Sequence, residues 1–187
     1  VGGNEGGTAP EKDAALLIAL RDIYKVHALR PPQEGNKTRG LAIVFAQTRH
    51  HVEYLRALLV SDGLLATAIY GSMDQTTRRL NLASFRSGKT PILVVTDVAA
   101  RGIDVPLLDY VIHYGFPSSP KLFVHRAGRA GRIKGNKGYS VCLVGVDEVP
   151  YMLDLFVFLG LKIQHGLRET KVITSERNDA AAAPKKT

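Results

Sequence analysis

The densest group of functional side chains lies between His125 and Arg132, which reads His-Arg-Ala-Gly-Arg-Ala-Gly-Arg. We place this segment at the end of a predicted helix, where Arg129 and Arg132, three residues apart, would project from one face together with His125. Gly128 and Gly131 carry no side chains, so a phosphate chain could approach closely. Two guanidinium groups on such a surface suit the spread negative charge of a transferring phosphoryl group.

A simpler interpretation of these residues is a solvated basic helix end, because the helix dipole favours arginine there. The interleaved glycines fit that interpretation poorly, since glycine weakens a helix. The pattern therefore favours a phosphate-binding function.

A second polar segment, Thr96 to Asp104, directly follows an apolar run. The Thr96 hydroxyl and nearby N–H groups could meet a phosphodiester, and Gly102 permits a tight turn. Asp104 supplies a carboxylate suited to a ribose hydroxyl. In a purely structural interpretation, Asp97 caps the following turn and Arg101 pairs locally. Taken alone, this segment leaves both interpretations open.

Three weaker segments also place hydrogen-bonding groups where predicted strands end or helices begin. Gln75 and Arg78 lie in the first turn of a predicted helix, where polar side chains can grip a nucleic-acid backbone. Tyr70-Gly71-Ser72 follows one apolar run and Gln47-Thr48-Arg49 follows another. Each would also pass for an ordinary surface segment, so the argument for function is their shared position at one edge of a sheet.

The elements that must position these groups alternate between strand and helix. Short apolar runs predict strands at 41–45, 65–70, 91–96, 110–113 and 139–144, and amphipathic patterns predict helices at 11–29, 51–60, 74–85, 119–130 and 149–159. Strands that are apolar throughout predict an α/β fold, a doubly wound parallel sheet with helices on both faces. Functional groups in such folds lie beyond the carboxyl ends of the strands.

Composition narrows the classes of protein further. A chain of 187 residues, 45% hydrophobic and 22% charged, predicts one globular domain, expected over 11–170 between a flexible lead-in (1–10) and a disordered tail (171–187). Neither a signal peptide nor a membrane-spanning run is expected. The single cysteine, Cys142, excludes a disulfide scaffold and favours a reducing compartment. The net charge of +8 favours polyanionic partners, nucleic acid first.

Two kinds of site are not expected in this sequence. Neither a G-x-x-x-x-G-K-[ST] loop nor an acidic metal-binding motif follows a strand, so the chain should not bind and hydrolyse a nucleoside triphosphate alone. His50 and His51 are adjacent on a predicted helix and would not converge on a metal, so we expect surface histidines.

Taken together, these motifs resemble the second, C-terminal RecA-like domain of DEAD-box RNA helicases, over roughly residues 11–165. Residues 45–49 match the family's fourth motif, and Gln75 and Arg78 match its Q-x-x-R element. Residues 96–104 match T-D-x-x-A-R-G-x-D, and residues 125–132 match H-R-x-G-R-x-G-R letter for letter.

The resemblance implies a role for each site residue. Arg129 and Arg132 would be arginine fingers that reach the γ-phosphate of ATP, and His125 would couple to the acidic motif of the first domain. Asp104, close to Gly102, would hold the ATP ribose. Mg²⁺ would be held mainly by that first domain, which the sequence does not include. The residues expected on the RNA backbone path are Thr48, Arg49, Gly71, Gln75, Arg78, Thr96 and Arg101.

The implied partners are RNA, bound largely without base preference, and the N-terminal RecA-like domain of the same protein. We expect a monomer without a membrane partner. Residues 74–85, 115–125 and 147–155 also resemble the nucleolar subfamily that assembles the large ribosomal subunit, which implies pre-ribosomal RNA and a nucleolar or nuclear location. Two alternatives remain: a non-catalytic RNA-binding or adaptor module, and a domain of a related DNA helicase.

Overall fold

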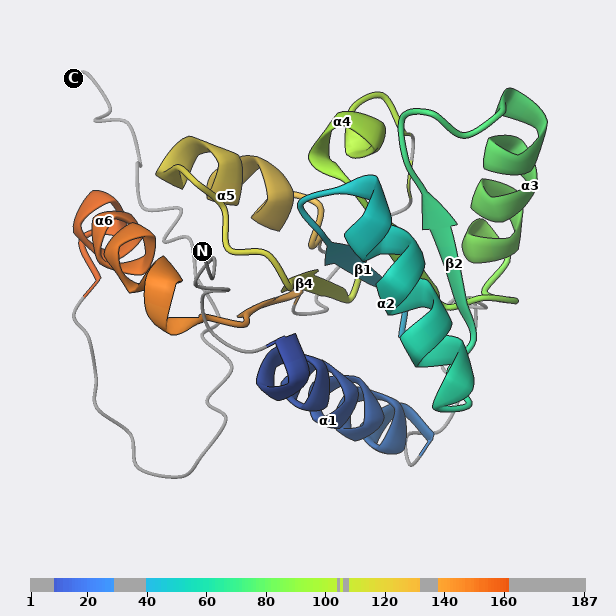
Figure 1. Ribbon diagram of the computed structural model, residues 1–187, viewed down its shortest axis with the longest axis horizontal. Helices are drawn as coiled ribbons and strands as arrows, with labels where there is room; N and C mark the ends of the chain where they lie inside the picture. The colour runs from blue at the N-terminus through green and yellow to red at the C-terminus, as the bar shows by residue number, and fades with distance from the viewer. Residues whose placement is uncertain (1–8, 29–39, 104, 106–107, 132–137, 162–187) are drawn as a thin grey trace, which may run out of the picture.

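The computed structural model describes residues 9–28, 40–103, 105, 108–131 and 138–161 (Figure 1). Two of the predicted site residues, Asp104 and Arg132, lie outside the described residues. The same holds for residues 1–8 of the expected lead-in and for the whole of the expected tail.

Strands and helices alternate along the chain, as the apolar pattern predicts. The helices are α1 (Ala9–Ala28), α2 (Arg49–Ser61), α3 (Gln75–Arg86), α4 (Asp97–Ala100), α5 (Pro120–Ala127), the short 3-10 helix η1 (Val146–Glu148) and α6 (Val149–Leu159). The strands are β1 (Ala42–Phe45), β2 (Ala66–Ile69), β3 (Ile92–Val95), β4 (Tyr110–His113) and β5 (Tyr139–Cys142).

The strands form one parallel sheet in the order β2-β3-β1-β4-β5. β1 is central, and its first residue Ala42 pairs with Ile92 on one side and Tyr110 on the other. The chain builds one half of the sheet with β2 and β3, then crosses to build the other with β4 and β5. This confirms the doubly wound parallel sheet, and it brings the carboxyl ends of all five strands to one edge.

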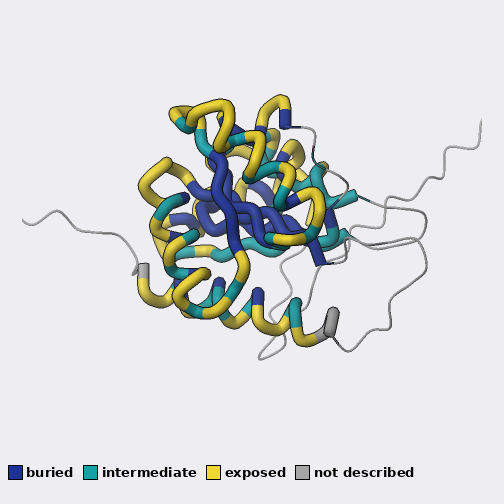
Figure 2. Tube along the Cα trace, turned by 90° about the vertical axis from the view of Figure 1, so that its right-hand side faces the viewer, coloured by how far each residue is buried: buried dark blue, intermediate teal, exposed yellow. Residues whose placement is uncertain are grey.

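Side chains of β1 alternate between two hydrophobic layers, because successive residues of a strand point to opposite faces. Ala42 and Val44 pack in the layer that includes α1 and α2, whereas Ile43 and Phe45 pack in the layer that includes α3 and α4. All four β1 residues are buried. Figure 2 shows the strands as the buried centre of the molecule, with exposed helical surface around them.

Four helices begin at the carboxyl edge of the sheet with a side-chain cap. The side-chain oxygens of Thr48, Asp74, Thr96 and Ser119 each accept a hydrogen bond from the backbone N–H three residues later, at 3.2, 2.9, 3.4 and 3.4 Å. Such a bond satisfies one of the N–H groups that a helix leaves unpaired at its start. The edge of the sheet is therefore lined by the N-termini of α2, α3, α4 and α5.

The predicted end of the helix at 119–130 was wrong. α5 ends at Ala127, so Arg129 lies beyond the helix and not within its last turn. The chain turns away because Leu108 N–H donates to Arg129 O at 3.2 Å and Gly131 N–H donates to Leu108 O at 3.2 Å. The segment after Thr96 forms a short helix, α4, which Thr96 caps; in the purely structural interpretation, left open above, Asp97 was the cap.

Candidate functional site

An ion pair between α5 and α4 joins the segments that carry the motifs at residues 125–132 and 96–104. The Arg126 guanidinium donates to both Asp97 carboxylate oxygens, from Nε at 2.7 Å and from Nη2 at 2.6 Å. Its Nη1 donates to the Gly115 carbonyl at 2.7 Å, and its charged carbon lies 5.0 Å from the centre of the Phe45 ring. Arg126 is 2% exposed, so this cation is buried with its donors directed to fixed partners.

Sequence reasoning missed the role of Arg126. The residue stands 29 positions from Asp97, and no local pattern reveals a partner at that distance. One signal was available in the sequence. Because Arg126 follows His125 directly, it lies about 100° further around the helix and therefore points away from the face that carries His125.

His125 and Arg129 are brought together as predicted, although by a turn and not by a helix face. Arg129 Nη2 lies 3.3 Å from His125 Nε2, and the Arg129 N–H donates to the Arg126 carbonyl at 3.0 Å. His125 is exposed and Arg129 is partly buried. Among the described residues no carboxylate forms an ion pair with Arg129.

Gly71, Arg78 and Thr96 lie on neighbouring elements at the carboxyl edge. Arg78 Nη2 donates to the Ala99 carbonyl at 2.9 Å, which ties α3 to α4. A Cβ added to Gly71 would lie 4.0 Å from Cγ1 of Val98 in α4. The loop after β2, the first turn of α3 and the start of α4 thus form one continuous surface.

Two further residues predicted to bind RNA lie at the same edge. Gln75 is exposed at the first position of α3, and Arg101 is exposed at the end of α4. Gly102 has φ +72°, a left-handed conformation that glycine adopts without strain, as the predicted tight turn requires.

Thr48 and Arg49 begin α2 beside the end of β2. Both are exposed. The Glu53 carboxylate of α2 raises the pKa of Tyr70, while the Arg49 charge acts in the opposite direction. Arg49 is therefore close enough to influence the end of β2, next to Gly71.

A buried histidine, His113, packs against α5. The His113 ring is stacked between Phe45 and Phe123, with centroids at 6.1 and 5.1 Å, and its Nε2 is 2.9 Å from Ser140 Oγ. Burial, followed by the charge of Arg126, lowers the pKa of His113 to about 3. The histidine is therefore neutral at physiological pH, beside the buried Arg126 cation.

Within the described ranges, no group of three or more His, Cys, Asp or Glu side chains could hold a metal ion. His50 and His51 are exposed, as expected for surface histidines. None of the described helices is both long and apolar enough to cross a bilayer.

Residues 20–134 match the family described as helicase conserved C-terminal domain. The chain belongs to this family, in its DEAD-box branch. Its fold is similar to Escherichia coli DEAD-box protein SrmB, solved bound to regulator of ribonuclease activity A, with TM-score 0.69, 28% identity and coverage of 91% of this chain and 94% of that chain. A DEAD box protein from Methanococcus jannaschii gives TM-score 0.67 and 30% identity, over 84% of this chain and 39% of that chain.

Among curated sequences the chain is similar to ATP-dependent RNA helicases of the DBP10 type. It is 45% identical over 180 residues to ATP-dependent RNA helicase DBP10 of Gibberella zeae, which covers 86% of this chain and 20% of that protein. Against dbp10 of Aspergillus fumigatus the identity is 54% over 129 residues, covering 69% of this chain and 15% of that protein. The chain therefore spans about a fifth or less of the length of these relatives.

Proposed function

We propose that this chain is the second RecA-like domain of an ATP-dependent RNA helicase, which supplies arginine fingers to ATP and a sequence-independent surface to the RNA backbone. The Arg126–Asp97 ion pair carries this proposal, because it joins α5, which contains the first residues of the 125–132 motif, to the start of α4. The ion pair thereby ties elements that carry residues expected at ATP to elements that carry residues expected at RNA.

In the proposed ATP site, Arg129 and Arg132 bind the γ-phosphate, and Asp104 holds the ribose beside the turn at Gly102. His125 couples to the acidic motif of the first domain. Support comes from the Arg129 side chain, which has no carboxylate partner among the described residues, and from the left-handed turn at Gly102. A related solved protein, Prp28 of Chaetomium thermophilum, is described as bound to ADP; it shares 30% identity with TM-score 0.62, over 79% of this chain and 34% of that chain.

In the proposed RNA site, the strand crosses the carboxyl edge of the sheet and its phosphates meet helix N-termini and arginines. The residues in this role are Thr48, Arg49, Gly71, Gln75, Arg78, Thr96 and Arg101. A helix N-terminus favours an anion through its unpaired N–H groups and its dipole. Because these contacts go to phosphates and sugars, binding should depend little on base sequence.

ATP turnover requires both RecA-like domains in this proposal. The first domain binds ATP and holds Mg²⁺, and joint binding of ATP and RNA closes the two domains. Each ligand can favour closure only through contacts that it gains in the closed state. The whole protein is proposed to act as a monomer on pre-ribosomal RNA in the nucleolus. The kind of RNA and the location rest on the resemblance of residues 74–85, 115–125 and 147–155 to the nucleolar subfamily.

The test compares the full-length parent protein with the isolated domain in an ATPase assay with and without RNA. We expect RNA-stimulated hydrolysis by the full-length protein and none by the isolated domain, which should bind RNA weakly and less tightly as salt rises. Robust hydrolysis by the domain alone would contradict the split site. RNA should stimulate more than DNA, and equal stimulation would favour the DNA-helicase alternative. A full-length protein without ATPase activity would favour the adaptor alternative.

A further inference from the structure

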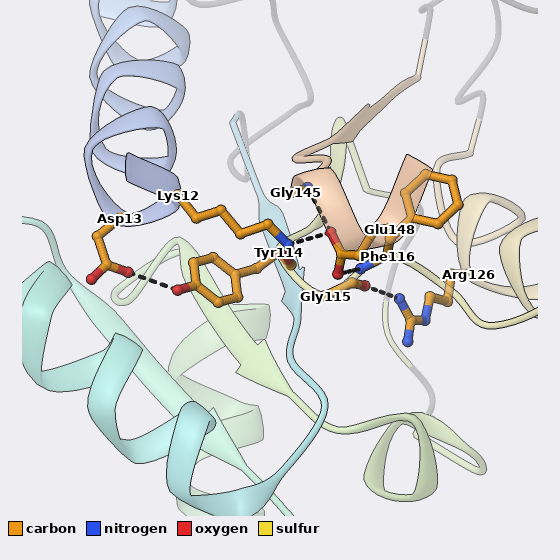
Figure 3. Close-up of polar contacts among 8 residues, drawn as sticks. All are labelled: Lys12, Asp13, Tyr114, Gly115, Phe116, Arg126, Gly145 and Glu148. Atoms are coloured by element: carbon orange, nitrogen blue, oxygen red, sulfur yellow. Dashed lines mark hydrogen bonds and ion pairs between the residues drawn. The ribbon is translucent and has the colours of Figure 1, made fainter. Parts of the chain in front are cut away.

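Glu148 is a buried carboxylate that joins its own segment to two segments distant in sequence. Its Oε1 accepts from the Phe116 N–H at 3.0 Å, and its Oε2 accepts from the Gly145 N–H at 2.9 Å and pairs with Lys12 of α1 (Figure 3). The Glu148 side chain is 9% exposed, and the Lys12 side chain is 16% exposed. A charge this buried is tolerated because its acceptor positions are filled.

The loop between β4 and α5 is held from several elements at consecutive residues. The Tyr114 carbonyl accepts a hydrogen bond from Lys12 Nζ at 3.2 Å. The Gly115 carbonyl accepts from Arg126 Nη1 at 2.7 Å, and the Phe116 N–H donates to Glu148. The Tyr114 hydroxyl also donates to Asp13 of α1 at 2.8 Å. Figure 3 shows this loop between Lys12 and Glu148 on one side and Arg126 on the other.

Arg126 connects this loop to the proposed arginine finger. Its guanidinium is fixed by the Gly115 carbonyl and by Asp97, and its own carbonyl accepts the Arg129 N–H at 3.0 Å. A displacement of the Gly115 carbonyl would therefore move or release one of the partners that orient Arg126. The backbone that carries Arg129 would follow.

We propose that Lys12 and Glu148 are positioning residues for ATP turnover. Their ion pair fixes the loop against which Arg126 docks, and it thereby sets the place of Arg129 without contacting either ligand. This inference rests on the proposed function of Arg129. Small displacements are sufficient to matter, because a misplacement of about 1 Å far from the reacting atoms can slow catalysis about 100-fold.

The experiment uses the full-length protein and measures RNA-stimulated kcat, the KM for ATP, RNA affinity and thermal stability. The variants are Glu148→Gln, Lys12→Met and Lys12→Arg. Asp62→Asn is the matched control, because Asp62 accepts from Arg21 Nε at 2.9 Å and so forms a second α1 ion pair that does not touch the loop. Arg129→Ala serves as the reference for a lost finger.

We expect Glu148→Gln and Lys12→Met to lower kcat at least tenfold, with KM and RNA affinity within twofold of wild type. Lys12→Arg, which keeps the charge and a donor, should restore most of kcat, and Asp62→Asn should leave kcat unchanged. A lower melting temperature with normal kcat would overturn the inference, as would equal effects of Lys12→Met and Asp62→Asn. A Lys12→Met protein that does not fold would also count against it.

The inference and the proposed function fail in different ways. A wild-type protein without RNA-stimulated ATPase, or a fully active Arg129→Ala variant, would contradict the proposed function. This inference alone would be contradicted by a different set of results. In that case the wild type is active, Arg129→Ala is inactive, and the Lys12 and Glu148 variants keep full activity.

Discussion

Arg126 and Asp97 form a two-point ion pair across the carboxyl edge of the sheet, with Nε–Oδ1 and Nη2–Oδ2 distances of 2.7 and 2.6 Å. The arginine is buried, whereas the Asp97 side chain is 26% exposed. The pair joins helices that enter the sheet edge from β3 and from β4, on opposite sides of the central strand. Its geometry therefore affects both halves of the doubly wound sheet.

Arg126→Lys should destabilise the domain although it keeps the charge. A lysine ammonium cannot reproduce the planar fork that serves Asp97 and the Gly115 carbonyl together. We expect the free energy of unfolding to fall by about 2 kcal/mol, less than for a fully buried pair, because Asp97 reaches solvent. Urea unfolding would measure this. Arg21→Lys, in the exposed pair with Asp62, is the control and should change stability by less than about 0.5 kcal/mol; equal losses would contradict the prediction.

Arg129→Ala in the full-length protein should abolish RNA-stimulated ATPase. Loss of an arginine finger costs about 10³–10⁵ in turnover in related phosphoryl-transfer systems. RNA affinity, measured by fluorescence anisotropy, should stay within about twofold, because the residue is assigned to ATP and not to the RNA backbone. Lys121→Ala removes an exposed cation from α5, the helix that precedes Arg129, and should leave both quantities unchanged. Wild-type turnover in Arg129→Ala would refute the assignment.

Gly71→Ala should weaken RNA binding without changing stability. The new Cβ would meet nothing closer than Val98 Cγ1 at 4.0 Å, so the folded protein has room for it. A methyl group that displaces one backbone contact to phosphate should raise the Kd for RNA about three- to tenfold. The opposite result is expected for Gly63→Ala, where φ is +81°: a loss of about 1 kcal/mol in stability with unchanged RNA binding. Unaltered RNA affinity of Gly71→Ala would remove Gly71 from the RNA path.

The buried His113 should make the domain less stable in mild acid. Burial lowers its pKa from 6.5 to about 3, so between these values the unfolded chain binds a proton that the folded chain does not. Stability therefore falls as pH decreases through this window, by about 1.4 kcal/mol per pH unit for one group. In His113→Phe this contribution should vanish, while Arg126 and Asp97, the charged neighbours of the ring, remain. Urea unfolding at pH 6 and at pH 4.5 would measure the free energy of unfolding of both proteins. The prediction would be contradicted if this free energy changed equally with pH in wild type and in His113→Phe.

The strands were predictable because the signal for a strand buried on both faces is local. The apolar run 110–113 coincides with β4, and the other strands begin and end within two residues of the predicted bounds. The order of the strands was not predicted, because it depends on pairing between strands that are far apart in the sequence. α4 was missed because four residues are too short to show a helical period.

The site was predictable as a set of segments but not as a set of contacts. The polar residues after β1, β2 and β3 lie at one edge, as parallel strands require. The end of α5 was misplaced because its last turn is determined by Leu108, a residue on another segment that pairs with the backbone of Arg129 and Gly131. The partners of Arg126 were hidden for the same reason, since they come from residues 97 and 115.

The helix caps at the sheet edge have a consequence for the direction from which an RNA strand can approach. A threonine hydroxyl that accepts a bond from a helix N–H still carries a proton of its own, so Thr48 and Thr96 each retain a donor. Asp74 caps α3 equally well, but its carboxylate can only accept, and hydrogen bonds from Thr77 lower its pKa and keep it ionised. A phosphodiester bound by the proposed side chains Gln75 and Arg78 of α3 would have to stay clear of the Asp74 carboxylate, whereas the starts of α2 and α4 present hydroxyl groups. The choice of capping residue thus selects where a polyanion can cross this edge, in addition to the arginines nearby.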